Sequence, residues 1–153
     1  MRSYGRWGVV MLALGGLLVM SATVMAGPTT PDPAKIVQVA ITKITNLTGA
    51  RVQVNQNAAA ATVAKVKQLL AAGKKAQAAK VASDAIKAIQ DGSVETVKHI
   101  HSLAKAAAKA VVAAGGTADQ VKQIQTAAEA GAKTVQDSAK AAVTQIRDAL
   151  AGK

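Results

Sequence analysis

Residues 117–151, TADQVKQIQTAAEAGAKTVQDSAKAAVTQIRDALA, carry the clearest structural pattern in the chain. Small and apolar side chains recur there in steps of three or four, which places them on one face of an α-helix. These positions are Val121, Ile124, Ala128, Gly131, Val135, Ala139, Ala142, Ile146 and Leu150. Thr117 suits the N-cap, and Gln120 three residues later completes a capping box. The stretch predicts one long amphipathic helix, with Gly131 as a point where it can bend.

Glycines and capping residues mark the expected helix boundaries before this stretch. Gly73 and the pair at 115–116 are expected to end helices, because glycine readily takes the left-handed conformation at a helix C-terminus. Residues 91–93, Asp-Gly-Ser, are expected to stop one helix and to cap the next. Asp32 and Pro33 fit the N-cap and the first position of the earliest helix. We therefore predict helices from residue 34 onward and then over about 57–72, 74–90 and 93–114.

The segment 36–54 has the least regular pattern. Val37, Ile41 and Ile44 are spaced as on a helix, but residues 50–57, ARVQVNQN, alternate as in a strand. A β-hairpin turning at residues 46–49 is the alternative. The helix is favoured because a lone two-stranded ribbon is only marginally stable and no further strand is predicted.

Composition supports a helical fold with a thin core. The chain has 153 residues, a formal net charge of +11 and no cysteine, and 33 of the 127 residues after position 26 are alanine. Alanine favours helix strongly but buries little surface. We predict an all-α, antiparallel bundle of four to five Ala-rich amphipathic helices, forming a single domain over residues 34–151.

The N-terminus has the features of a signal peptide. Two arginines in residues 1–7 precede an apolar run over 8–26, which ends in Val24-Met25-Ala26 with small residues where a signal peptidase cuts. We expect residues 1–26 to be removed between Ala26 and Gly27, leaving residues 27–33 as a Pro-rich tether and an exported, periplasmic or secreted protein. The alternative is an uncleaved membrane anchor, because 19 apolar residues nearly span a bilayer.

Several kinds of chemistry are not expected. His99 and His101 stand two residues apart, so on a helix they point about 200° apart and do not chelate one ion together. A closed zinc site needs four ligands, and the chain has no other histidine and no cysteine. Residues 102–105, SLAK, match the S-x-x-K motif of penicillin-recognising enzymes but lack its partner motifs. We predict a protein that is not an enzyme and that uses no metal or cofactor.

The excess of lysine is the feature with functional content. The candidate contact residues are Lys98, Lys105, Lys109, Lys74, Lys75 and Lys80, and Lys65, Lys67 and Lys87 belong to the same lysine-rich surface. Such a surface attracts polyanions by counterion release, with little selectivity. Base stacking is not expected, because Tyr4 and Trp7 are the only aromatic residues and both precede Ala26. The expected partners are an anionic envelope polymer or lipid headgroups, without specific nucleic-acid recognition; the alternative is that the charge serves solubility.

Three other functions stay open. Residues 66–89, VKQLLAAGKKAQAAKVASDAIKAI, resemble one hairpin of the tetratricopeptide repeats, which implies a peptide-binding module, although the bulky aromatic positions of that family are missing. Alanine-lined helix faces with near-heptad spacing favour a self-assembling homo-oligomeric scaffold. Amphipathic helices with lysines beside the apolar face are typical of proteins that bind lipid surfaces.

Overall fold

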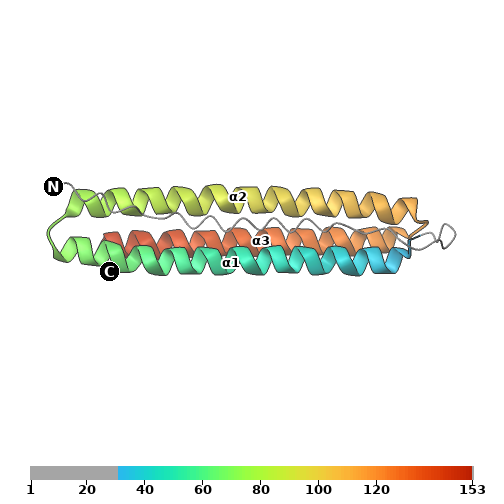
Figure 1. Ribbon diagram of the computed structural model, residues 1–153, viewed down its shortest axis with the longest axis horizontal. Helices are drawn as coiled ribbons and strands as arrows, with labels where there is room; N and C mark the ends of the chain where they lie inside the picture. The colour runs from blue at the N-terminus through green and yellow to red at the C-terminus, as the bar shows by residue number, and fades with distance from the viewer. Residues whose placement is uncertain (1–30, 153) are drawn as a thin grey trace, which may run out of the picture.

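The computed structural model describes residues 31–152, which form three long helices running alternately in opposite directions (Figure 1). These are α1 (Pro33–Ala71), α2 (Lys75–Ala113) and α3 (Ala118–Leu150). The first two contain 39 residues each, a length of about 58 Å. The predicted signal peptide and most of the predicted tether lie outside the described residues.

The all-α bundle is confirmed, but the predicted number of four to five helices is wrong. α1 continues through the proposed hairpin at 46–49, and α2 continues through residues 91–93. Gly49 and Gly92 each cost a helix only about 1 kcal/mol relative to alanine. Contacts with both neighbouring helices outweigh that cost, because the buried stripe of each helix runs past its glycine on both sides.

The predicted ends of these helices are confirmed where a left-handed glycine or a cap marks them. Gly73 and Gly115 have φ of 74° and 76°, so they occupy the left-handed conformation that closes a helix. The Thr117 amide donates to Gln120 Oε1 at 2.9 Å, and Thr117 Oγ1 accepts from the Gln120 amide at 3.3 Å. Asp32 caps α1 by accepting from the Ala34 amide at 2.9 Å.

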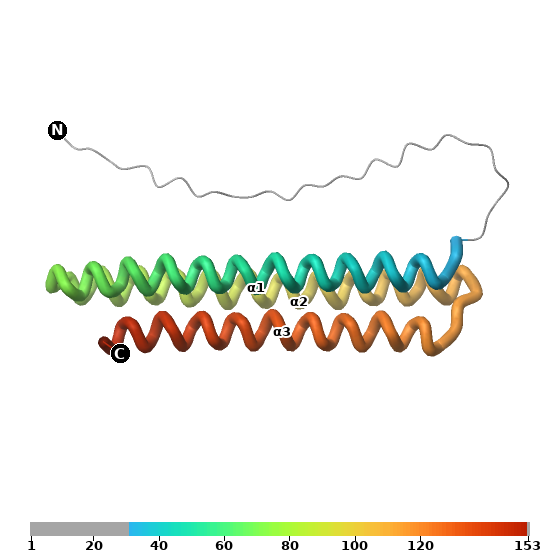
Figure 2. Tube along the Cα trace, turned by 90° about the horizontal axis from the view of Figure 1, so that it is seen from below, coloured from blue at the N-terminus to red at the C-terminus, as the bar shows by residue number. Residues whose placement is uncertain are grey.

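An 11-residue repeat organises the core. Its fully buried members are Ile44, Asn55 and Val66 in α1, Ala78, Ile89, Ile100 and Val111 in α2, and Ile124, Val135 and Ile146 in α3. Eleven residues in three turns give 3.67 residues per turn, close to the 3.6 of a straight helix. The three apolar stripes therefore stay facing one another along nearly straight helices (Figure 2). The near-heptad spacing expected for the last helix is thus corrected to an 11-residue one.

A polar layer divides the core midway along the bundle. One apolar cluster surrounds Val66, Ile89 and Ile146, and the other surrounds Ile44 and Ile100. Between them Asn55, fully buried, donates through Nδ2 to Ser93 Oγ at 3.2 Å and to Ser138 Oγ at 3.5 Å. Ser93, predicted as an N-cap, is instead a buried member of this layer.

Arg51 covers the polar layer from the α1–α2 side. Its Nη2 donates to the Ile89 carbonyl at 2.9 Å, and its Nε donates to Ser93 Oγ at 3.3 Å. Burial lowers the pKa of the Arg51 guanidinium. The guanidinium lies directly over Gly92, where a Cβ atom would stand 2.6 Å from Nη2 and 2.7 Å from Cζ. Gly92 therefore provides the space in which Arg51 reaches the backbone of α2.

Candidate anion-binding surface

All six predicted contact lysines lie on one helix or in the turn before it. Lys74 and Lys75 stand at the start of α2, Lys80 follows, and Lys98, Lys105 and Lys109 lie toward its other end; all are exposed. Because α2 is one continuous helix, Lys75 and Lys109 are about 51 Å apart along its axis. The six side chains therefore form two separate groups rather than one patch.

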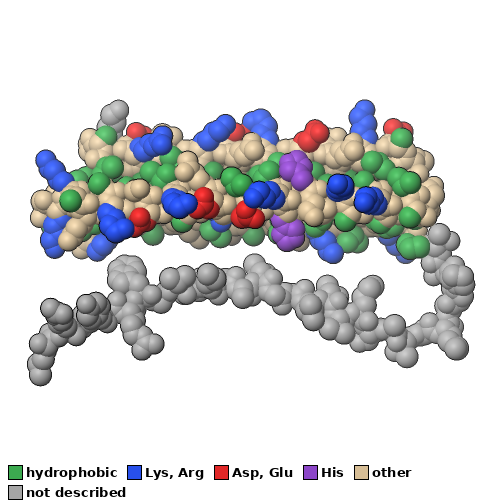
Figure 3. Space-filling model, turned by 90° about the horizontal axis from the view of Figure 1, so that it is seen from above, with side chains coloured by type: hydrophobic (Ala, Val, Ile, Leu, Met, Phe, Trp, Pro, Cys, Tyr) green, Lys and Arg blue, Asp and Glu red, His purple; other side chains and the backbone are tan. Residues whose placement is uncertain are grey.

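Acidic residues neutralise the middle of α2. Lys80 pairs with Asp84 at 2.9 Å and Lys98 with Glu95 at 2.8 Å. The hydrogen bond to Glu95 raises the pKa of Lys98. Figure 3 shows this alternation of basic and acidic side chains along one face of the bundle. The other four predicted lysines, Lys74, Lys75, Lys105 and Lys109, make no ion pair with any described residue.

The three helices carry very different net charges. α1 holds five basic residues and no acidic one, whereas α3 holds four of each. The basic residues of α1 are Lys35, Lys43, Arg51, Lys65 and Lys67. No aspartate or glutamate occurs between residues 33 and 83. The positive field of the bundle is therefore strongest along α1 and around the turn that joins α1 to α2.

Lysines of α1 line grooves beside α2 at both ends of the bundle. At the end of the bundle where α1 is joined to α2, Lys65 lines a groove together with Val81 of α2. Lys67, Lys74 and Lys75 follow Lys65 closely along the chain, in the last turns of α1 and the start of α2. At the opposite end, Lys35 and Lys43 lie along the groove between α1 and α2. Lys65 and Lys67 belong to the lysine-rich surface predicted from the sequence, whereas Lys35 and Lys43 were not predicted. The signal that could have indicated them is the acid-free stretch 33–83.

Lys105 and Lys109 occupy a different groove from Lys35 and Lys43. They line the space between α2 and α3, together with His101, Gln125 and Glu129. The Glu129 carboxylate weakens the attraction of an anion to that groove. An acid thus stands beside each of these lysines, Glu95 beside Lys98 and Glu129 beside Lys105 and Lys109. The positive potential around this triad is therefore weaker than that around the lysines of α1.

The histidines lie on different sides of α2. His99 is grouped with Glu95, Lys98 and Ser102, whereas His101 lies in the groove facing α3; Figure 3 shows the two purple side chains apart. Both histidines and Ser102 are exposed, and no hydrogen bond joins Glu95, His99 and Ser102. Within residues 31–152 no three potential ligand side chains converge on a metal position.

None of the three described helices is long and apolar enough to cross a membrane.

Comparisons with protein-family models, with curated proteins and with solved structures find no match to the chain. The candidate site therefore rests on the geometry of the bundle alone. It is the basic surface formed by α1 and by the two ends of α2.

Proposed function

We propose that this protein is a non-enzymatic binding protein of the cell envelope that attaches to anionic polymers or anionic surfaces through α1 and the ends of α2. The observation that carries the proposal is the separation of charge: α1 has five basic residues without an acid, while α3 is balanced. Uniform solubility would be served equally well by lysines spread over all three helices.

The side-chain chemistry favours non-selective electrostatic binding. Arg51 and Arg147 are the only arginines in the described residues, and Arg51 is occupied by the backbone of α2. Lysine acts as a point charge without the two-pronged phosphate geometry of arginine. Such a surface follows the charge density of its partner and loses affinity steeply as salt rises.

The test is the salt dependence of binding to a polyanion. The protein is titrated with heparin or polyphosphate between ~50 and ~200 mM salt, and log K is plotted against log salt. Three variants each replace three basic side chains with glutamine: Lys65, Lys67 and Lys74; Lys98, Lys105 and Lys109; and Lys122, Lys133 and Lys140 on the balanced helix α3. Each lost contact with the polyanion is expected to reduce the magnitude of this slope, by an amount of the order of the ~0.7–0.9 per phosphate known for nucleic acids.

The variant at the α1–α2 turn is expected to lose most affinity, the α2 variant less, and the α3 variant least. Alanine at both histidines is expected to leave the slope unchanged. All three triple variants change the net charge equally, so equal losses would show that only total charge matters. That outcome, or no binding at ~50 mM salt, would overturn the proposal.

The location in the envelope rests on residues 1–26. A basic start, an apolar run and small residues at Val24 and Ala26 fit export with cleavage. We therefore propose that the exported form begins at Gly27. Mass determination of the protein recovered from a secretion-competent host tests this; an intact N-terminus would favour the anchored alternative instead.

A further inference from the structure

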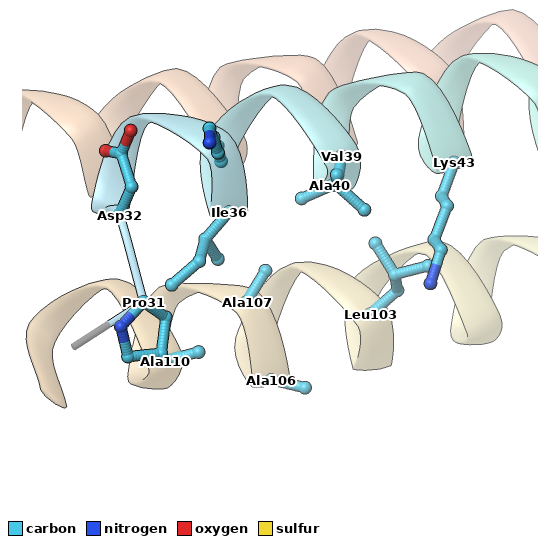
Figure 4. A pocket seen from close by; sticks show the side chains of 11 residues that line it. Pro31, Asp32, Ile36, Val39, Ala40, Lys43, Leu103, Ala106, Ala107 and Ala110 are labelled. Atoms are coloured by element: carbon cyan, nitrogen blue, oxygen red, sulfur yellow. The ribbon is translucent and has the colours of Figure 1, made fainter. Parts of the chain in front are cut away.

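An apolar groove runs between the first turns of α1 and the last turns of α2. Its floor is formed by Ile36, Val39 and Ala40 from α1 and by Leu103, Ala106, Ala107 and Ala110 from α2 (Figure 4). The volume is about 530 Å³, within the range of small-molecule sites. Val39 is 53% exposed there, so the apolar lining of the groove is open to solvent.

The groove exists because α2 contributes mostly alanines to the contact between α1 and α2, whereas α1 contributes larger side chains. Ala107 presents only a methyl group toward α1, and Ala106 and Ala110, which also line the groove, add only methyl groups on the α2 side (Figure 4). Three methyl groups do not fill the space between two helix axes, so the outer part of the seam stays open. Ala40 belongs to the buried apolar cluster around Ile44 and Ile100, so it marks the inner edge of the groove.

The rim of the groove is positively charged. Lys35 and Lys43 both line it, and the stem of Lys43 extends from α1 toward Leu103 of α2 (Figure 4). Asp32 is the only acid at the groove, and its carboxylate points away and caps the Ala34 amide. α2 carries no acid after Glu95. The groove thus combines an apolar floor with two cations at its edge.

We propose that this groove binds the alkyl chain of a single-chain anionic amphiphile, with its head group held at one end of the groove by Lys35 or Lys43. The inference rests on the proposed function, because it names the class of anion that one part of the basic surface prefers. An anionic polymer without an apolar part gains nothing from the floor. A neutral amphiphile leaves both ammonium groups without a partner.

The size of the groove sets the expected dependence on chain length. From Asp32 to Lys43 the groove follows α1 for about 16 Å. Each added methylene is expected to strengthen binding by about fourfold while it still finds apolar surface. The increase is expected to stop once the chain is longer than the groove.

The experiment is calorimetric titration of the protein with alkyl phosphates of increasing chain length, below their micelle-forming concentrations. Inorganic phosphate provides the head group alone, and alkyl glucosides provide neutral heads. The alkyl phosphates are expected to bind at least tenfold more tightly than glucosides of the same chain length. Inorganic phosphate is expected to show no binding.

Two variants separate the floor from the rim. Ala106→Leu with Ala110→Leu fills the groove at exposed positions and is expected to abolish the dependence on chain length. Lys35→Gln with Lys43→Gln is expected to keep that dependence and to lose the preference for anionic heads. The matched controls are Ala79→Leu, at an exposed alanine of α2 outside the groove, and Lys133→Gln with Lys140→Gln on α3; both are expected to bind as the unmodified protein does.

Binding that is independent of chain length, or unaffected by the two leucines, would overturn the inference. The leucine variant is also expected to bind heparin normally, because its lysines are intact. If the protein binds heparin normally but does not bind alkyl phosphates, only the inference about the groove is wrong. If it binds alkyl phosphates but not heparin, the broader proposal of polyanion binding is wrong and the inference about the groove is retained.

Discussion

Replacing Gly92 by alanine is expected to have opposite effects on stability with and without Arg51. Alanine in place of a mid-helix glycine normally stabilises a protein by about 1 kcal/mol. At Gly92, however, the new methyl group would stand 2.6 Å from Arg51 Nη2. Arg51 would have to leave the Ile89 carbonyl and the Ser93 hydroxyl.

The size of the loss follows from the kind of bond that breaks. A hydrogen bond to a charged group contributes about 1.5–3 kcal/mol. Since that loss exceeds the gain in helix propensity, Gly92→Ala is expected to lower the free energy of unfolding by about 0.5–2 kcal/mol in the unmodified protein. In an Arg51→Ala background the same change is expected to raise it by about 1 kcal/mol.

Urea unfolding followed by helical circular dichroism measures all four members of this cycle. Gly49→Ala is the matched control, because a methyl group there meets nothing within 4 Å. It is expected to stabilise both backgrounds by about 1 kcal/mol. If Gly92→Ala stabilised both backgrounds equally, Arg51 would not depend on the space above Gly92, and the assigned role of that glycine would be wrong.

Three further predictions concern the core and the surface. Asn55→Ala is expected to lower the free energy of unfolding by about 1–3 kcal/mol, measured with urea, because it removes the hydrogen bonds to the buried Ser93 hydroxyl and the half-buried Ser138 hydroxyl and leaves only Arg51 Nε on Ser93. Thr48→Val removes a buried oxygen that has no hydrogen-bond partner in residues 31–152, so it is expected to raise the free energy of unfolding by about 1 kcal/mol. Gly131→Ala would bring a methyl group within 2.6 Å of that oxygen, so it is expected to lower the free energy of unfolding by about 1–3 kcal/mol. The hydrogen bond from Lys133 lowers the pKa of Asp137 below 3.8, so this pair stabilises the fold above pH 3.8 and its contribution is lost as the pH falls through the lowered pKa. Thermal melts between pH 2 and 5 are expected to show a smaller decline on acidification for Asp137→Asn than for the unmodified protein.

The sequence predicts the turns of this fold better than the continuity of its helices. Gly73, Gly115 and the Thr117 capping box are local signals, and each marks a real helix boundary. Gly92 and Ser93 carry the same local signal, yet they lie in the middle of α2. Their roles depend on Arg51 and Asn55, about 40 residues earlier in the chain, and local propensity does not report on contacts at that distance.

The candidate surface was predicted only in part for a related reason. The many lysines of α2 are visible in the sequence as a candidate contact surface. The sequence also indicates that some of them are neutralised, since Asp84 stands four residues after Lys80 and pairs with it on a helix. The contribution of α1 depends on an absence, the missing acids between residues 33 and 83. The groove that joins Lys43 to Leu103 needs the antiparallel pairing of two helices, which no spacing along one helix shows.

The buried Asn55 also determines how the helices align along their length. Because apolar residues recur every 11 positions, sliding one helix past the others by one repeat would match apolar stripe to apolar stripe again. Asn55 stands in the same line as Ile44 and Val66, so any slide would press its amide against aliphatic side chains and leave it without hydrogen bonds. One polar layer thus gives a repetitive, alanine-rich sequence a single register.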